Sequence, residues 1–190
     1  MAFESDWIFL RAALPDLQAY VISSELYWTL RPASRTPSGA QAPQLTLGNL
    51  LLSQARLAAS NLSAGEQAEL AELQRGFAAV REEWRANWGR KADQEFHSRL
   101  NLWQQYLREL RGDAHPSPVF YAREVRQRAI LHLLPSEMSS GVPAHEQGQL
   151  TMLDGNLRGV GRSGPFVWEP ELAGSFDPAE FWFLYLDVTK

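Results

Sequence analysis

The chain of 190 residues contains no cysteine. This absence excludes disulfides, zinc sites with thiolate ligands, iron–sulfur clusters and a thiol nucleophile. It fits a reducing compartment, and we expect a cytoplasmic protein. Long apolar runs are also missing, because no segment approaches the ~18 consecutive apolar residues of a membrane helix. The first residues lack the basic and apolar regions of a secretory signal peptide, so we expect neither export nor a membrane anchor.

The sequence also lacks a strong excess of charge of one sign. The sequence has 22 acidic and 18 basic residues, which gives a formal net charge of −4. Arginine and lysine are in excess over residues 75–128, and aspartate and glutamate are in excess over residues 129–190. Acidic residues interrupt the basic segment, and a chain with this balance lacks the electrostatic signature of a nucleic-acid-binding protein. We therefore expect no nucleic acid as a partner.

Large apolar side chains, in contrast, are abundant. The chain has 7 tryptophans and 9 phenylalanines within a hydrophobic fraction of 45%. They provide the apolar area for a packed core, and the length fits one helical domain over residues 1–190. Residues 31–44 contribute little to such a core, because they combine three prolines and a glycine with small polar residues. This composition is typical of a loop, and we expect the loop to be mobile.

Apolar residues recur at helical spacing in three segments, 15–28, 46–60 and 120–134. Pro15 suits the first position of the first helix, because no intrahelical amide bond is made there. Thr46 is a typical N-cap for the second helix, since its hydroxyl can accept a hydrogen bond from an amide of the first turn. The sequence therefore predicts a helix in each segment.

A longer helical pattern begins at Ser63 and Glu66, which have the spacing of a capping box. Apolar residues then continue at a mean spacing of about 3.7, close to the helical period. They are Leu70, Leu73, Phe77, Val80, Trp84, Trp88, Ala92, Phe96, Leu100, Trp103, Leu107 and Leu110. We predict one long central helix over residues 64–111, which would be roughly 70 Å long. A compact domain of this size is shorter, so we expect either a kink at Gly89 or a helix that projects into a partner.

The last part of the chain changes in composition. Residues 148–168 are rich in glycine and proline, and Asp154–Gly155 between two apolar runs predicts a tight β-hairpin. The aromatic run that follows Asp177 and Pro178 fits a short helix by its start signals and a buried strand by its composition. The predicted fold is therefore mostly α: a bundle of four to five helices, with a small C-terminal hairpin and an aromatic segment, residues 148–190, packed on it.

Motifs that would carry catalysis or metal binding are incomplete. Residues 159–164 match G-x-G-x-x-G, but Pro165 and an extended segment follow where phosphate binding needs a helix. No Glu-x-x-His pair is present to hold a metal in a helical bundle, and no serine has the spacing of a nucleophile elbow. Asp93 and His97, four residues apart, are expected to pair on the helix surface. We therefore predict no catalytic residue, no metal and no cofactor.

The candidate binding residues lie in the basic middle of the chain. They are Arg81, Arg85, Trp88, Trp103, Arg123 and Arg126. Clustered arginines can bind phosphates or acidic partners, and tryptophans can stack on a planar ligand or a base. The alternative is that the arginines pair with neighbouring acids at the surface and that the tryptophans belong to the core.

The leading hypothesis is a non-enzymatic interaction protein that binds itself or a protein partner through the long helix. A helix over 64–111 outruns the shorter helices that would cover it, and an uncovered apolar stripe favours a homodimer. One alternative is a nucleic-acid or anion binder that uses the arginines of 75–128. Another is an enzyme or a small-ligand pocket within the bundle. A bound molecule or a buried polar cluster would favour the last of these.

Overall fold

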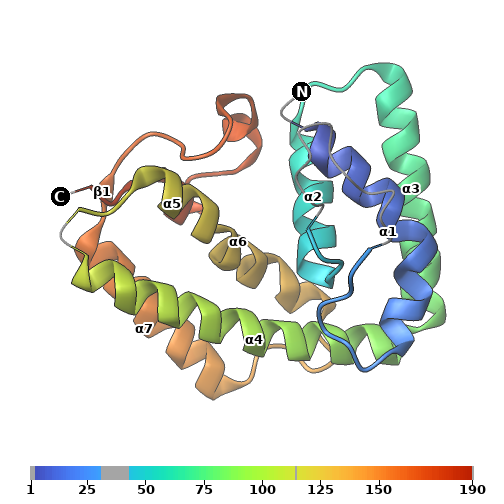
Figure 1. Ribbon diagram of the computed structural model, residues 1–190, viewed down its shortest axis with the longest axis horizontal. Helices are drawn as coiled ribbons and strands as arrows, with labels where there is room; N and C mark the ends of the chain where they lie inside the picture. Colours follow the sequence, from blue (N-terminus) through green and yellow to red (C-terminus); the bar gives the residue numbers. More distant parts are fainter. Residues whose placement is uncertain (1–2, 31–42, 114, 190) are drawn as a thin grey trace.

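The computed structural model describes residues 3–30, 43–113 and 115–189, and most of these residues are helical (Figure 1). The α-helices are α1 (Glu4–Ile22), α2 (Leu47–Ala59), α3 (Ala64–Glu83), α4 (Arg85–Gly112), α5 (Pro118–Glu124), α6 (Arg126–Leu133) and α7 (Ala144–Val160). Short 3-10 helices are η2 (Leu134–Glu137), η3 (Pro170–Ser175) and η4 (Trp182–Tyr185). Two short strands, β1 (Arg162–Ser163) and β2 (Leu186–Asp187), pair antiparallel. The predicted mostly α fold with a small β pair near the C-terminus is confirmed.

The helices form two groups that meet along α2, α4 and α6. In Figure 1, α1, α2 and α3 lie together on one side, and α4 runs across the lower part of the molecule. The other side holds α5, α6 and α7, with α6 and α7 packed on α4. The C-terminal segment contacts α5 at Tyr121 and α6 at His132, and η3 packs on α2.

The predicted long helical segment is helical on both sides of one break. Trp84 has φ −113° and ψ 32°, outside the helical range, and α3 and α4 run in clearly different directions from it (Figure 1). The kink expected at Gly89 therefore lies at Trp84. Because of this turn, α3 packs against α1 and α2, whereas α4 packs against α6 and α7.

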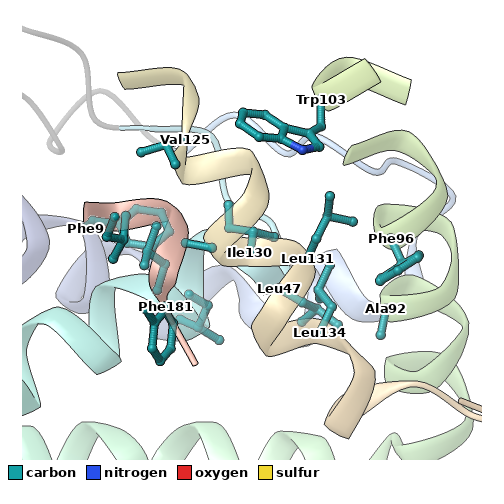
Figure 2. Packing of buried hydrophobic residues seen from close by; sticks show 14 of the residues in the cluster. Phe9, Leu47, Ala92, Phe96, Trp103, Val125, Ile130, Leu131, Leu134 and Phe181 are labelled. Atoms are coloured by element: carbon teal, nitrogen blue, oxygen red, sulfur yellow. The ribbon is translucent and has the colours of Figure 1, made fainter. Parts of the chain in front are cut away.

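The apolar stripe of this segment is covered within the chain. Ten of its twelve predicted positions are buried, and only Val80 and Trp84 are half-buried. Figure 2 shows Phe96 and Ala92 of α4 facing Leu131 of α6 and Leu134 of η2. The uncovered stripe on which the predicted homodimer was based is therefore not present.

Local capping signals are confirmed at two helix starts. The Thr46 hydroxyl accepts a hydrogen bond from the Asn49 amide at 3.1 Å, and Ser63 with Glu66 forms the predicted capping box. The first predicted helix has wrong bounds, because α1 starts at Glu4 and keeps Pro15 in its interior. Burial of Phe9, Leu10, Ala13 and Leu17 on both sides of Pro15 offsets the hydrogen bond that proline cannot make. The predicted helix over 120–134 is divided at Val125 into α5 and α6.

The hairpin turn predicted at Asp154–Gly155 is wrong, because α7 continues through both residues. Leu150, Leu153 and Leu157 are buried at helical spacing, and this apolar face favours the helix over the turn. The two strands instead join residues far apart, with Arg162 opposite Asp187 and Ser163 opposite Leu186.

The aromatic tail is neither the predicted helix from Pro178 nor one continuous strand. Residues 182–185 form η4, and β2 follows directly. Phe183 and Leu184 are fully buried, and the buried Phe181 lies in the core shown in Figure 2. The Tyr121 hydroxyl donates a 2.6 Å hydrogen bond to the Phe183 carbonyl and so joins the tail to α5.

Of the loop predicted over 31–44, residues 31–42 lie outside the described residues. None of the described helices is long and apolar enough to cross a membrane.

Candidate functional site

Three of the predicted binding residues gather where residues 136–139 lie against α3 and α4. Arg81, Arg85 and Trp88 line a small pocket of about 190 Å³ there. Glu137 connects two of them: one oxygen accepts a hydrogen bond from Arg81 at 3.2 Å, and the other accepts from the Trp88 indole at 2.8 Å. Arg85 instead pairs with Glu82 at 2.7 Å on the exposed surface. These cations therefore have acidic partners from within the chain.

Gly89 allows this loop to approach α4. A Cβ atom at Gly89 would lie 2.3 Å from the Ser139 hydroxyl and 3.2 Å from the Ser139 backbone nitrogen. Real Cβ atoms do not come as close as 2.3 Å, so an added Cβ would force the Ser139 hydroxyl to turn away and would still crowd the Ser139 backbone nitrogen at 3.2 Å. The glycine that the sequence suggests as a kink is thus a contact point between helix and loop.

We expect Gly89→Ala to destabilise the protein, although alanine favours a helix interior over glycine. The added methyl group overpacks the contact with Ser139, which costs about 1–3 kcal/mol and exceeds the helical gain of at most about 1 kcal/mol. Gly155→Ala in α7 is the matched control, because a Cβ atom there meets nothing within 4 Å. That variant should gain stability. Urea unfolding of both variants decides the matter, and equal stabilisation of the two would contradict the assigned contact.

The other predicted residues are dispersed. Trp103 is fully buried in the core, and its indole nitrogen has no hydrogen-bond partner among the described residues. Arg123 on α5 pairs with Glu124 at 3.0 Å and lies over the ring of Phe120. Arg126 is half-buried on α6, and no hydrogen bond or ion pair joins it to another described residue. Burial and the nearby Arg56 lower the pKa of Arg126. The structure therefore does not bring the six predicted residues into one site.

A larger pocket of about 460 Å³ lies next to the Arg81 pocket, between α4, the loop of residues 138–143 and α7. Its lining residues are Asp93, Gln94, His97, Met138, Ser140, Gly141, Pro143 and Glu146. Met138 lines both pockets. The larger pocket combines two carboxylates and an imidazole with an apolar thioether and a proline ring, a combination that suits a small organic ligand.

Glu146 orients the imidazole of this pocket. Its Oε1 lies 2.7 Å from His97 Nδ1, and Asn101 Nδ2 lies 3.2 Å from His97 Nε2. Since an amide nitrogen can only donate, this network assigns the proton of the neutral imidazole to Nδ1, which donates to Glu146. Glu146 itself is buried in the first turn of α7, where the helix N-terminus stabilises a carboxylate.

The predicted pairing of Asp93 with His97 is not the one formed. Asp93 Oδ1 accepts a hydrogen bond from the Ser139 amide at 3.3 Å, and His97 pairs with Glu146. The other Asp93 oxygen has no hydrogen bond to a described residue, so it can accept one from a ligand in the pocket.

Sequence reasoning did not find Glu146 or Ser140 as site residues. Both come from a segment that the sequence places in a loop before a hairpin, whereas the structure starts α7 at Ala144. Glu146 in the first turn of a helix is a recognisable pattern, but only after the helix itself is recognised.

In the described part of the chain, no three His, Asp or Glu residues are grouped to hold a metal ion. Comparisons with protein-family models, curated proteins and solved structures found no match.

Proposed function

We propose that this protein is a non-enzymatic binding protein whose pocket between α4 and α7 takes a small organic molecule with a positively charged nitrogen. The observation that carries this proposal is the pairing of two carboxylates, Asp93 and Glu146, with an apolar lining in one concave site. Ligand sites in proteins are typically concave and mostly apolar, with a few placed polar groups that fix the orientation of the ligand.

The chemistry of each lining residue supports a cationic ligand. The oxygen of Asp93 that is not bonded to Ser139 can accept from an ammonium group, and such charge-assisted bonds are the stronger ones. Met138 and Pro143 offer apolar surface for the rest of the molecule. The negative charge of the Asp93 carboxylate, which has no cationic partner among the described residues of the pocket, would repel an anion of the same shape.

The protein partner and homodimer predicted from the sequence stay hypotheses, now without the long helix's apolar stripe as their interface. The stripe is covered by α1, α2, α6 and α7, so ligand binding in the pocket requires no second copy. Arg81, Arg85 and Arg123 each face a carboxylate of this chain, which supports the expectation that nucleic acid is not a partner. A cytoplasmic location belongs to this proposal as well.

Benzylamine and benzoate test the proposal, because they share a ring and differ in charge. We expect saturable benzylamine binding, followed by changes in the protein NMR spectrum, and no benzoate binding at the same site. Asp93→Asn keeps an acceptor for the Ser139 amide but removes the charge, and it should weaken benzylamine binding by about tenfold, which is about 1.4 kcal/mol.

Glu109→Gln on the exposed face of the same helix is the control and should bind benzylamine as the parent protein does. Equal binding of benzylamine and benzoate, or an Asp93→Asn variant with unchanged affinity, would show that the carboxylates do not select the ligand.

A further inference from the structure

A second, separate pocket of about 270 Å³ lies where the end of α1 packs against α4. The polar side chains that line it are Ser23, Ser24, Asn87, Arg90, Lys91 and Gln94, and Val21 and Ile22 complete the wall. Two of the lining residues are cations and none is a carboxylate. Its electrostatic character is therefore opposite to that of the Asp93 pocket, from which Gln94 separates it.

Lys91 is the unusual residue of this pocket. It is only 3% exposed, yet no carboxylate of the described chain forms an ion pair with it. Its ammonium group donates to the Ser23 hydroxyl at 3.4 Å and to the Glu25 carbonyl, and lies 4.6 Å from the centre of the Tyr20 ring. Burial lowers the pKa of Lys91, and the nearby Glu25 charge only partly offsets that effect. A buried cation without an ion pair is costly, and an anion beside it would remove part of that cost.

The surrounding groups suit an oxyanion with several acceptor atoms. Arg90 is exposed at the same pocket and adds a second positive charge with a planar donor fork. Ser24 and Asn87 add a hydroxyl and an amide donor, whereas the Ser23 hydroxyl already donates to the Tyr20 carbonyl at 2.8 Å. The last carbonyls of α1 would repel an anion, but the Ser23 amide bonds to the Ala19 and Tyr20 carbonyls at 3.1 and 3.2 Å. The donors come from two elements, the end of α1 and α4, and a phosphate has more acceptor oxygens than a carboxylate to share among them.

We propose that the pocket formed by Ser24, Arg90 and Lys91 binds a phosphate group, either inorganic phosphate or the phosphate of a small metabolite. This site is independent of the amine pocket proposed above. A volume of about 270 Å³ admits a phosphate with a small organic remainder. Lys91 supplies the buried charge, Arg90 the exposed charge, and the Ser24 hydroxyl and the Asn87 amide add hydrogen-bond donors.

Calorimetric titration of the full chain with inorganic phosphate tests the site, with acetate at equal ionic strength as the planar anion. We expect saturable phosphate binding that is at least about tenfold tighter than acetate binding. Arg90→Gln should weaken phosphate binding by about tenfold, the effect of one charge-assisted contact, and Lys91→Met should weaken it further. Arg108→Gln, an exposed arginine elsewhere on α4, is the matched control and should leave the affinity unchanged.

Arg90→Gln alters an exposed side chain, so it reports on the site even where Lys91→Met affects folding. Phosphate binding that Arg90→Gln leaves unchanged, acetate binding as tight as phosphate binding, or no saturable binding would each overturn the proposal. A small phosphomonoester, glycerol 3-phosphate, then separates the two sources: tighter binding than inorganic phosphate assigns the site to a metabolite, and weaker binding assigns it to the free ion. Asp93→Asn should not change phosphate affinity, and Arg90→Gln should not change benzylamine affinity, so the failure of one site leaves the other standing.

Discussion

Removal of residues 177–190 is expected to lower the free energy of unfolding by about as much as the whole protein possesses. The segment contributes four buried side chains to the core, Phe181, Phe183, Leu184 and Val188. Burial of a large apolar side chain is worth about 1.5–3 kcal/mol, so the four together represent about 6–12 kcal/mol. A domain of this kind has a total stability of about 5–15 kcal/mol. The shortened chain should therefore lose its cooperative thermal transition in circular dichroism.

A single substitution within the tail tests its contribution to the stability of the core with less disturbance of the fold. Phe183 is fully buried, and Phe183→Ala should cost about 3–5 kcal/mol through lost burial and the cavity that remains. Phe120 on α5 is the matched control, because its side chain is 41% exposed. Phe120→Ala should cost less than about 1 kcal/mol, since little apolar area leaves the core. A truncated chain that melts at the parent temperature, or equal losses for the two alanine variants, would show that the tail does not stabilise the core.

Patterns within one element predicted the helical part of this fold. Thr46 and Ser63 mark helix starts because an N-cap needs only its own neighbours. The apolar stripe from Leu70 to Leu110 was predicted for the same reason, since periodicity depends on one helix and its buried face. How the helices are placed relative to one another cannot be predicted from patterns within one helix. The break at Trp84 has no proline or glycine to mark it, and it is set by which neighbours α3 and α4 pack against.

The errors came from residues whose partners are distant in the sequence. From the sequence alone, Gly89 is typical of a helix kink, and its role as a contact point becomes visible only when Ser139 is known to pack against it. Asp154 before Gly155 is typical of a turn, but in α7 its carboxylate accepts hydrogen bonds from Arg128 at 2.8 and 2.9 Å. The candidate site was missed for the same reason, because 49 positions separate His97 from Glu146. No local spacing relates two such residues before the path of the chain is known.

The second large effect is expected at Arg56, which holds a buried ion cluster together. Arg56 Nε donates to Asp6 at 3.0 Å, and its two terminal nitrogens donate to Glu169 at 3.1 and 3.0 Å. Asp6 and Arg56 are each 4% exposed, and Asp6 also accepts from the Ser53 hydroxyl at 2.8 Å. The guanidinium group lies over the ring of Trp168. The cluster joins α1, α2 and the segment before η3, so its loss affects three parts of the fold.

Arg56→Met should cost about 3–5 kcal/mol, because it leaves the buried carboxylate of Asp6 without its cation. Arg85→Gln is the control: the Arg85–Glu82 pair has side chains that are 74% and 69% exposed, and its loss should cost less than about 1 kcal/mol. Adding Asp6→Asn to Arg56→Met removes the uncompensated charge, so the double variant should be more stable than Arg56→Met alone. Urea unfolding of the three variants gives the comparison. If Arg56→Met cost no more than Arg85→Gln, the buried ion cluster would not stabilise the fold. If Asp6→Asn only added to the loss, the uncompensated charge would not be its cause, and lost packing of the Arg56 side chain against Trp168 would explain it.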